Sequence, residues 1–252
     1  MKITTDGIVI RERIVKESDK VITVLTRDNG VVSAYAAGAK NIKNPKSTAT
    51  GLLTYSQFVF YKRNERFTVD EAHAKEIFIE LRSDLEKLAL AQYFCELVGE
   101  LVSEGGFSEE PLRLTLNSLY LLCKDKRPPA LVKAAYELRL MSLCGFMPNL
   151  ICCSGCAAYE HPAMSFIPAD GELLCGDCAG VAKNHRIVTG LGVTTAMRHC
   201  IYSEFDKLFS FSLSERSLPI LEKAAEEYVI CQLDRNFKTL EFYKTIRGGV
   251  SQ

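Results

Sequence analysis

Two Cys-x-x-Cys pairs constrain the fold of this chain more than any other feature. Their members, separated by eighteen residues, are Cys153 and Cys156, then Cys175 and Cys178. Four thiolates at this spacing can surround one ion in the tetrahedral geometry that zinc takes from four cysteines. Gly155 and Gly176 lie inside the pairs, where the chain turns sharply and a Cβ atom would be in the way. The pairs therefore predict a zinc-binding ribbon over residues 151–184, in which metal binding replaces part of a hydrophobic core.

The type of zinc site follows from the number of thiolates. A catalytic zinc keeps an open position for water, whereas four thiolates fill the shell, so we expect a structural metal. His161 could replace a cysteine, but it follows the first pair, while zinc deaminases place His-x-Glu ahead of their cysteines. A redox disulfide needs only one pair in a strand-to-helix context, and two matched pairs argue against that alternative.

The charge of the chain is unevenly distributed. The 252 residues carry no formal net charge, yet residues 1–67 contain twelve Lys and Arg against six acids, a net charge of +6. This asymmetry suggests a polyanionic partner for the N-terminal part. No stretch approaches the roughly eighteen apolar residues of a membrane span, and residues 1–10 do not resemble a signal peptide. We therefore expect a cytoplasmic protein with no membrane partner.

Residues 7–70 show the alternation of short strands. The expected strands are 7–10, 21–26, 31–35, 58–61 and 67–69. Asn29-Gly30 predicts a tight hairpin turn, and the polar residues 63–66 predict a second hairpin. Residues 40–51 are too polar to pack and predict a mobile basic loop. The pattern is typical of an OB-type barrel, although an SH3-like barrel would look much the same.

Such a barrel can hold a single strand when cations follow the phosphates and aromatic rings stack on the bases. The residues that we predict to bind DNA are Lys16, Lys20, Arg27, Tyr35, Lys40, Lys43, Lys46, Arg63 and Arg66. Tyr55 and Tyr61 are further candidates for stacking, whereas the phenylalanines of these strands are expected to fill the barrel. In the alternative reading, which stays open, these charges only hydrate the surface of the barrel.

Beyond residue 80 the apolar residues recur with the period of a helix. Ser83-Asp-Leu-Glu86 predicts a capping box, and Gly105-Gly106 predicts the end of the first helix. Further helices are expected over 108–122, 130–143, 192–202 and 218–237, with a frayed end over 247–252. The fold class is therefore α+β. Its expected domains are an OB-fold domain over 1–80, a helical domain over 81–150 and 185–252, and the inserted zinc ribbon over 151–184.

Short motifs follow one another along the chain in the order of a known family. They are Gly7-Ile-Val-Ile10, Glu17-Ser-Asp-Lys20, Val24-Leu-Thr26-Arg27, Gly30-Val-Val-Ser33, Ala36-Ala-Gly38-Ala39-Lys40, Leu81-Arg82, Tyr93 with Glu96-Leu97, and Cys144-Gly145-Phe146 with Pro148. Together with the cysteine pairs, this order resembles the RecO family of bacterial DNA repair proteins over nearly the whole chain. The family often has a lysine where this chain has Ala37, so one phosphate contact is not expected here.

The resemblance implies a protein without a catalytic site that binds single- and double-stranded DNA and anneals complementary strands. It also implies work at the nucleoid with RecR, in the RecFOR pathway, to load RecA onto strands coated by single-stranded DNA-binding protein. Some members lack the cysteines, so the resemblance does not make zinc a requirement for annealing. The resemblance further implies that the chain binds the acidic C-terminal tail of the coating protein, which would fit an apolar groove flanked by cations. Those available on the second and third expected helices are Arg113, Lys124, Lys126, Arg127, Lys133 and Arg139.

Two other classes of protein stay open. A zinc-ribbon scaffold or adaptor with no direct role in DNA binding would keep the metal site and show no salt-sensitive DNA binding. An enzyme would need an acid cluster for Mg²⁺ or an open metal site. Glu109-Glu110 and Glu226-Glu227 are adjacent pairs on expected helices, where neighbours point about 100° apart, so we interpret them as solvated surface.

Overall fold

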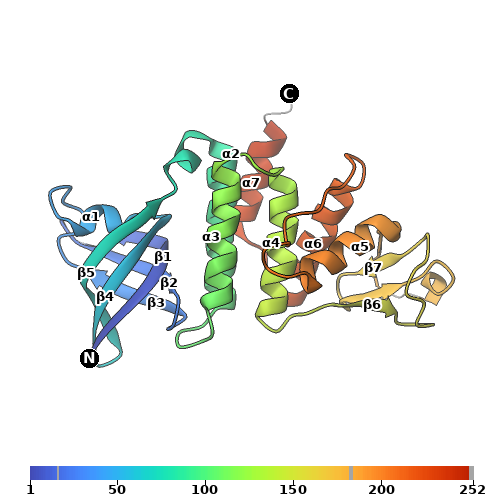
Figure 1. Cartoon of the computed structure of the whole chain (residues 1–252), viewed down its shortest axis with the longest axis horizontal. Coiled ribbons are helices and arrows are strands. Elements are labelled where there is room, and N and C mark those ends of the chain that lie inside the picture. The colour runs from blue at the N-terminus through green and yellow to red at the C-terminus, as the bar shows by residue number, and fades with distance from the viewer. Residues whose placement is uncertain (16, 182–183, 250–252) are drawn as a thin grey trace. The chain divides into compact units, whose positions relative to one another are not determined.

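A computed structural model describes residues 1–15, 17–181 and 184–249 (Figure 1). The chain forms two compact units, of which one combines Met1–Cys123 with Phe237–Gln252 and the other is Lys124–Asn236. A β-barrel opens the first unit, and helices with a small sheet make up the second, so the predicted α+β class is confirmed. The three-domain division expected above follows motifs rather than compactness, and it stays a prediction.

Five strands close into the N-terminal barrel. They are β1 (Lys2–Ile14), β2 (Lys20–Thr26), β3 (Val31–Ala36), β4 (Thr54–Arg63) and β5 (Arg66–Ile77). Their order around the barrel is β1-β2-β3-β5-β4; β1 pairs antiparallel with both β2 and β4, and the parallel pair β3–β5 completes the ring. The predicted OB-type barrel is confirmed. Most of its strands are longer than predicted, because their ends carry polar, outward-facing residues that a search for apolar runs does not include.

Phenylalanines fill the barrel, as predicted. Phe58 and Phe60 lie in parallel planes with ring centroids 5.2 Å apart, and Phe67 meets Phe60 edge-on at 6.0 Å. All three are buried in one cluster with alanines of β3 and β5. Small residues opposite large rings let the two sides of a narrow barrel interdigitate.

The two hairpin turns differ from each other. Between β2 and β3 the predicted hairpin is confirmed by their antiparallel pairing, but Asn29-Gly30 does not form a tight turn by itself. Residues 27–30 connect the two strands, and among them only Gly30 takes a left-handed conformation, with φ +65°. Between β4 and β5 the predicted turn is confirmed, because Arg63 pairs with Arg66. Its central residues Asn64 and Glu65 both have positive φ, +45° and +63°, as a type I′ turn requires.

The loop expected to be unpacked contains a short helix instead. Residues Lys46–Ala49 form α1, which lies against β4 and β5 (Figure 1). Ala49 belongs to the barrel core, and Thr50 is fully buried with its hydroxyl bonded to the Lys46 carbonyl at 2.7 Å. The prediction of a loop without packing is therefore wrong for residues 46–51, since small side chains reached a core that a search for large apolar residues overlooked.

Besides α1, the helices of the first unit are η1 (Ile79–Ser83), α2 (Leu85–Leu101), α3 (Glu109–Cys123) and α7 (Lys238–Gly249). The capping-box prediction is wrong: Asp84 is the N-cap of α2 and accepts from the Lys87 N–H at 3.1 Å, while Ser83 bonds back to Glu80. The α2 helix also ends earlier than expected, at Leu101 rather than at Gly105-Gly106. Helix α7 lies beside α2, where the Glu96 carboxylate accepts from the Thr239 N–H at 3.2 Å.

The expected last helix is present but ends four residues early. The second unit contains α4 (Pro129–Leu143), β6 (Asn149–Cys153), β7 (Ser165–Ile167), β8 (Glu172–Leu174), η2 (Ala179–Val181), β9 (Ile187–Val188), α5 (Gly190–Tyr202) and α6 (Leu218–Leu233). Asp234 caps α6 in a left-handed conformation, with φ +45°, so the helix predicted over 218–237 is confirmed but ends at Leu233. The frayed end predicted over 247–252 is wrong for 247–249, which belong to α7, and residues 250–252 lie outside the described residues.

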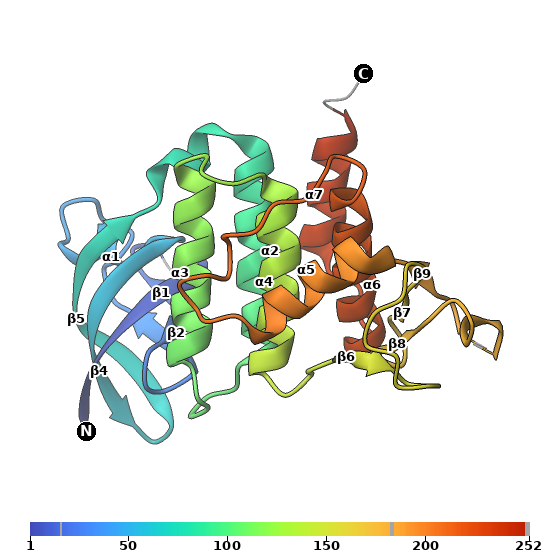
Figure 2. The ribbon, with the colours of Figure 1, turned by 45° about the vertical axis from the view of Figure 1, so that its right-hand side comes forward.

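The small sheet has the order β6-β8-β7-β9 and lies beside α5 and α6 (Figure 2). The predicted hairpin is confirmed by the antiparallel pairing of β7 with β8. Over the part of the chain that the structure describes, no helix combines the length and apolarity needed to cross a membrane.

Candidate nucleic-acid interface and metal centre

The four predicted cysteines meet at one point of the second unit. Cys153 ends β6 and Cys175 follows β8, which pairs with β6, so the sheet brings the two pairs together. All four sulfurs lie within 4.8 Å of one another, and the sulfurs of Cys156 and Cys175 are 3.6 Å apart. A tetrahedron with Zn–S bonds of about 2.3 Å has an edge of about 3.8 Å. The cluster can therefore bind a metal ion. All ten cysteines are free thiols, so the disulfide alternative is not what the structure contains.

Backbone N–H groups prepare the cluster for negative charge. Burial alone would raise the pKa of Cys153, but N–H groups of Cys175, Cys156 and Gly155 point at its sulfur and lower its pKa to about 6. The Cys175 N–H donates to this sulfur at 3.2 Å. The thiol of Cys178 is hydrogen-bonded to the sulfurs of Cys175, Cys156 and Cys153, and these bonds to its protonated form raise the pKa of Cys178 to about 12. Burial and the negative charge of Cys153 act in the same direction. A bound metal ion reverses that preference and holds all four as thiolates.

The glycines of the two pairs are required by close approach rather than by backbone angle. A Cβ on Gly155 would lie 3.0 Å from the Cys178 sulfur, and one on Gly176 would lie 2.8 Å from the His161 ring. The left-handed residue next to the first pair is Ala157, which follows Cys156 and has φ +61°. His161 is not a ligand in this arrangement; its Nδ1 accepts N–H bonds from Ala163 at 3.0 Å and from Gly176 at 3.3 Å.

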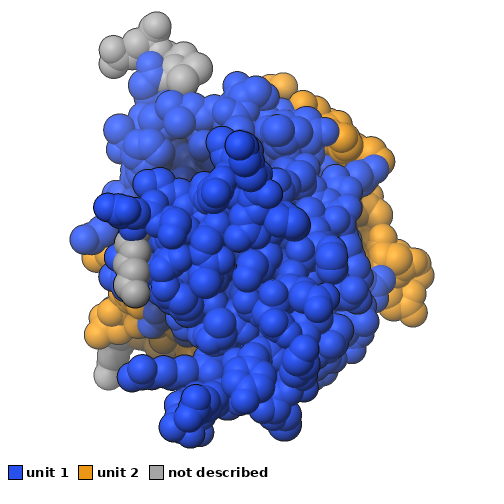
Figure 3. All heavy atoms as spheres, turned by 90° about the vertical axis from the view of Figure 1, so that its left-hand side faces the viewer, with its two compact units in different colours: residues 1–123, 237–252 blue, residues 124–236 orange. Residues whose placement is uncertain are grey.

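The first unit, coloured blue in Figure 3, contains the barrel. A row of outward side chains crosses this barrel from strand to strand. Residues paired directly across strands point to the same face. Arg13 pairs with Val21, Val21 with Tyr35, Tyr35 with Thr68, and Thr68 with Tyr61. Tyr35 of β3 and Tyr61 of β4, with β5 between them, therefore share an outer surface with Arg13 of β1.

Arg11 and Arg13 were not among the predicted DNA-binding residues. Strict alternation from the buried Val9 would point both arginines into the barrel. The register of β1 shifts between Val9 and Arg11, and this bulge turns both side chains outward, where they are exposed. A charged residue two positions from a buried one on an expected strand is the signal that could have revealed the bulge.

The predicted barrel cations differ in their surroundings. Lys20 is paired with Glu12 at 2.9 Å, and the Lys46 ammonium donates to the Val69 carbonyl at 3.3 Å. Lys16 lies outside the described residues. The exposed members of the set are Arg27, Lys40, Lys43, Arg63 and Arg66. Because β5 extends to Ile77 and adds acids, residues 1–77 have thirteen Lys and Arg against nine Asp and Glu, a net charge of +4 rather than +6.

The cations predicted for an acidic partner divide into two groups. Arg113, Lys124 and Lys126 are exposed and Arg127 is half-buried. Lys133 is 0% exposed, and its ammonium lies 2.9 Å from both Glu137 and Glu226. Burial disfavours its charge, but the two carboxylates outweigh burial, so the pKa of Lys133 is raised. This site does not suit a surface contact, and Glu226 is not the solvated residue that we expected.

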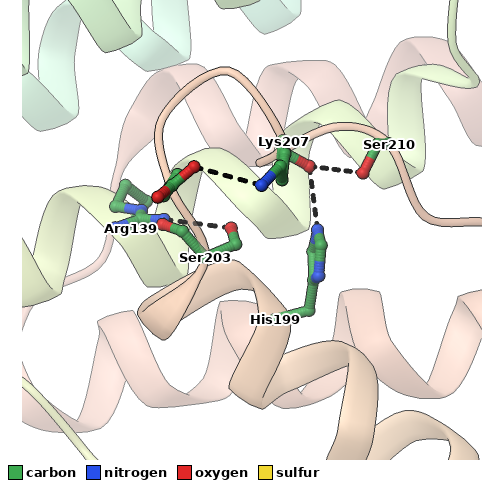
Figure 4. Close-up of polar contacts among 6 residues, drawn as sticks. Arg139, His199, Ser203, Lys207 and Ser210 are labelled. Carbon is green, nitrogen blue, oxygen red and sulfur yellow. Dashed lines mark hydrogen bonds and ion pairs between the residues drawn. The ribbon is translucent and has the colours of Figure 1, made fainter.

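Arg139 is held by the loop that follows α5 (Figure 4). Its guanidinium donates to the carbonyl and, at 3.2 Å, to the hydroxyl of Ser203. The Lys207 carbonyl holds the later part of the same loop. It lies 2.9 Å from His199 Nε2 and accepts a hydrogen bond from the Ser210 hydroxyl at 2.7 Å. Arg139 thus fixes the start of this loop in the second unit. Arg139 is buried, whereas a partner contact would require an exposed side chain.

Together the barrel, the helices and the cysteine cluster define an α+β protein with an OB-type domain and a metal-binding centre. A family model described as Recombination protein O N terminal matches residues 1–78, and one described as Recombination protein O C terminal matches residues 82–241. The chain belongs to the RecO family of DNA repair and recombination proteins, which confirms the resemblance drawn from its motifs.

Curated relatives match over nearly their whole length. The DNA repair protein RecO of Acetivibrio thermocellus is 34% identical over 242 residues, which cover 96% of each chain. That of Symbiobacterium thermophilum is 32% identical with 97% of each chain covered. That of Alkaliphilus metalliredigens is 30% identical, covering 98% of this chain and 100% of the relative.

Proposed function

We propose that this protein is a non-enzymatic recombination mediator of the bacterial cytoplasm and nucleoid. It binds single- and double-stranded DNA through its barrel, anneals complementary strands, and acts with RecR to load RecA onto strands coated by single-stranded DNA-binding protein. The family supports a role in DNA repair. The observation that carries the proposed interface is the outward row that contains Arg13, Tyr35 and Tyr61.

Each part of this surface has a physical task. Exposed cations neutralise phosphates and release their counterions, which makes binding strong at low salt and independent of sequence. Tyrosine rings stack on bases of any sequence, at about 1–3 kcal/mol per base. Annealing follows because two strands whose charge is partly neutralised repel each other less, so that base pairing can begin. The residues proposed for DNA contact are Lys16, Lys20, Arg27, Tyr35, Lys40, Lys43, Lys46, Arg63 and Arg66, with Arg11, Arg13 and Tyr61 added.

We propose zinc as the metal of the cysteine cluster, held by Cys153, Cys156, Cys175 and Cys178. Thiolate ligands in a closed tetrahedral set favour zinc over harder cations. When bound, the ion supplies cross-linking of β6 to the segment after β8 and no open position for chemistry. Its role is structural.

An acidic C-terminal tail of single-stranded DNA-binding protein is a further proposed ligand of this chain. Arg113 of the first unit is one candidate contact, and Lys124, Lys126 and Arg127 of the second unit are separate candidates, because each side chain is at least partly exposed. Lys133 and Arg139 serve the packing of the second unit instead.

The second candidate function is a zinc-ribbon scaffold without DNA binding, which the well-formed cysteine cluster favours. An annealing assay separates the two. Complementary oligonucleotides, bare and coated with single-stranded DNA-binding protein, are mixed with the purified full chain, and duplex formation is followed with time. The proposed mediator accelerates duplex formation in both samples and leaves strand length unchanged. A scaffold gives the uncatalysed rate, and shortened strands would point to a nuclease.

A further inference from the structure

We propose that Ile42 is an apolar contact for DNA bases, presented at the tip of the loop between β3 and α1. This inference rests on the proposed DNA binding and adds to it a residue that recognises the base rather than the phosphate. Ile42 is 93% exposed, more than any other large apolar side chain among the described residues. The folded chain therefore leaves nearly the whole side chain in water, and covering it with a base would be favourable.

The tip of this polar loop is ordered by hydrogen bonds. Ile42 and Lys43 are the central residues of a turn in which the Asn44 N–H donates to the Asn41 carbonyl at 2.8 Å. The side chain of Asn41 accepts from the Lys43 N–H at 3.0 Å. At the other end, the Asn44 amide donates to the Gly38 carbonyl at 3.0 Å. Both ends of the turn are thus fixed by asparagine side chains, and Ile42 projects from a preorganised loop.

The base of the loop is tied to the barrel. The Asp19 carboxylate accepts from the Gly38 N–H at 2.8 Å, and the Lys40 N–H donates to the Ser18 carbonyl at 3.0 Å. These bonds join the loop to the β1–β2 connection, next to the outward surface that carries Tyr35. A side chain held in this way loses little conformational entropy on binding, which favours affinity.

The charges around the tip select the ligand. Lys40 and Lys43, both exposed, flank Ile42, and no acidic residue occurs between Asp28 and Glu65 in the sequence. An apolar group between two cations matches a chain of phosphates whose bases offer apolar faces. In a single strand the faces of the bases are open to such a contact. We therefore assign the ligand as an unpaired base of single-stranded DNA.

The test compares two oligonucleotides with the same phosphates, one with normal bases and one with abasic sites throughout. The variant Ile42→Ala should bind the normal strand about 10- to 60-fold more weakly, because it lacks three carbons and the upper figure applies when the base buries all three. It should bind the abasic strand as the unaltered protein does. Its salt dependence should not change, since no phosphate contact is removed. Ile42→Met should retain most of the affinity.

A matched control is Ile79→Ala, which removes a side chain that is 62% exposed on η1. This change should leave both affinities unaltered. Normal binding of the standard oligonucleotide by Ile42→Ala would overturn the inference, and so would an equal loss on both oligonucleotides. If the unaltered protein bound neither oligonucleotide at low salt, the proposed function would fall as well. If only the inference about Ile42 is wrong, the unaltered protein still binds both oligonucleotides, and this result distinguishes the two failures.

Discussion

The Tyr35 hydroxyl donates a hydrogen bond to the carboxylate of Asp19, and this bond fixes a ring on the outward surface of the barrel. The bond raises the pKa of Tyr35, with burial and the negative charge of Asp19 acting in the same direction. The same carboxylate accepts from the Gly38 N–H at 2.8 Å, where the loop that carries Ile42 begins. One aspartate therefore orients both a candidate stacking ring and the loop beside it.

Replacing Tyr35 tests whether its ring contacts bases. Tyr35→Ala should weaken binding of single-stranded DNA about tenfold, because a base–ring stack contributes about 1–3 kcal/mol. Tyr35→Phe keeps the ring and should cost less. Fluorescence anisotropy with a labelled oligonucleotide measures both affinities. As a control, Tyr202→Ala removes a half-exposed tyrosine of α5 and should have no effect. Equal affinities for Tyr35→Ala and the unaltered protein would remove Tyr35 from the interface.

The buried cluster around Lys133 should contribute strongly to the stability of the second unit. Lys133→Met leaves the carboxylates of Glu137 and Glu226 without their shared cation, and we expect a loss of about 3–5 kcal/mol. Lys223→Met is the matched control, because Lys223 is 57% exposed beside Glu227 and its pair is expected to contribute about 0–1 kcal/mol. Urea denaturation of each variant gives the comparison. Equal losses would mean that the cluster is not specially stabilising.

The pH dependence of the same cluster has a defined sign. The pKa of Lys133 is raised above its ordinary value of 10.5, so its contribution to stability is fully present below the unfolded pKa. It is lost as the pH rises through the folded pKa. The Lys133→Met penalty should therefore be constant from neutral pH to about pH 9 and should shrink only above about pH 10.5. A penalty that disappears near neutral pH would contradict the raised pKa.

Removing the metal should unfold the ribbon. Chelation removes the ion from four intact cysteines, and Cys175→Ser leaves only three thiolates to bind it. Either change removes the metal binding that stands in for a core. We expect about one zinc ion per chain in elemental analysis, and a lower unfolding temperature after chelation. Cys231→Ser, which alters an exposed cysteine of α6, should change neither quantity. A chain that contains no metal and unfolds at the same temperature with and without chelator would contradict the assignment.

The β4–β5 turn offers a test of backbone strain. Glu65 has φ +63°, a conformation that glycine adopts without cost and other residues adopt at about 1 kcal/mol. Glu65→Gly should therefore stabilise the barrel by about 0.5–1 kcal/mol in thermal or urea unfolding. Glu65→Ala removes the same charge and keeps the unfavourable angle, so it should not stabilise. A gain of equal size in both variants would show that charge, and not backbone strain, is responsible.

Features with a fixed spacing could be predicted from the sequence. The four cysteines lie in two short segments, and a single ion sets their geometry, so their meeting required no knowledge of the rest of the fold. Asn64 and Glu65 lie between complementary strands, and the polar turn was evident. In both cases the contacts are local or are imposed by one ligand.

Features that depend on distant partners could not be predicted in this way. Lys133 resembled a surface cation because its partner Glu226 lies 93 residues away in the sequence. The bulge of β1, which turns Arg13 outward, depends on its pairing with β2. Helix α7 returns to the first unit, where Phe237 packs edge-on against Tyr93, with centroids 5.8 Å apart. The apolar period did not predict α7, because only Leu240 and Tyr243 of this helix are buried.

The central claim is that exposed cations of the barrel bind DNA phosphates, and the salt dependence of binding tests it most directly. The affinity for a single strand is measured from about 50 to 300 mM salt. Its logarithm should fall linearly with the logarithm of the salt concentration, with a slope near −0.7 for each phosphate contacted. In the variant Lys40→Gln with Lys43→Gln the slope should become shallower by about 1.4, because two contacts are removed. An affinity that does not change with salt, or a variant slope equal to that of the unaltered protein, would contradict the account.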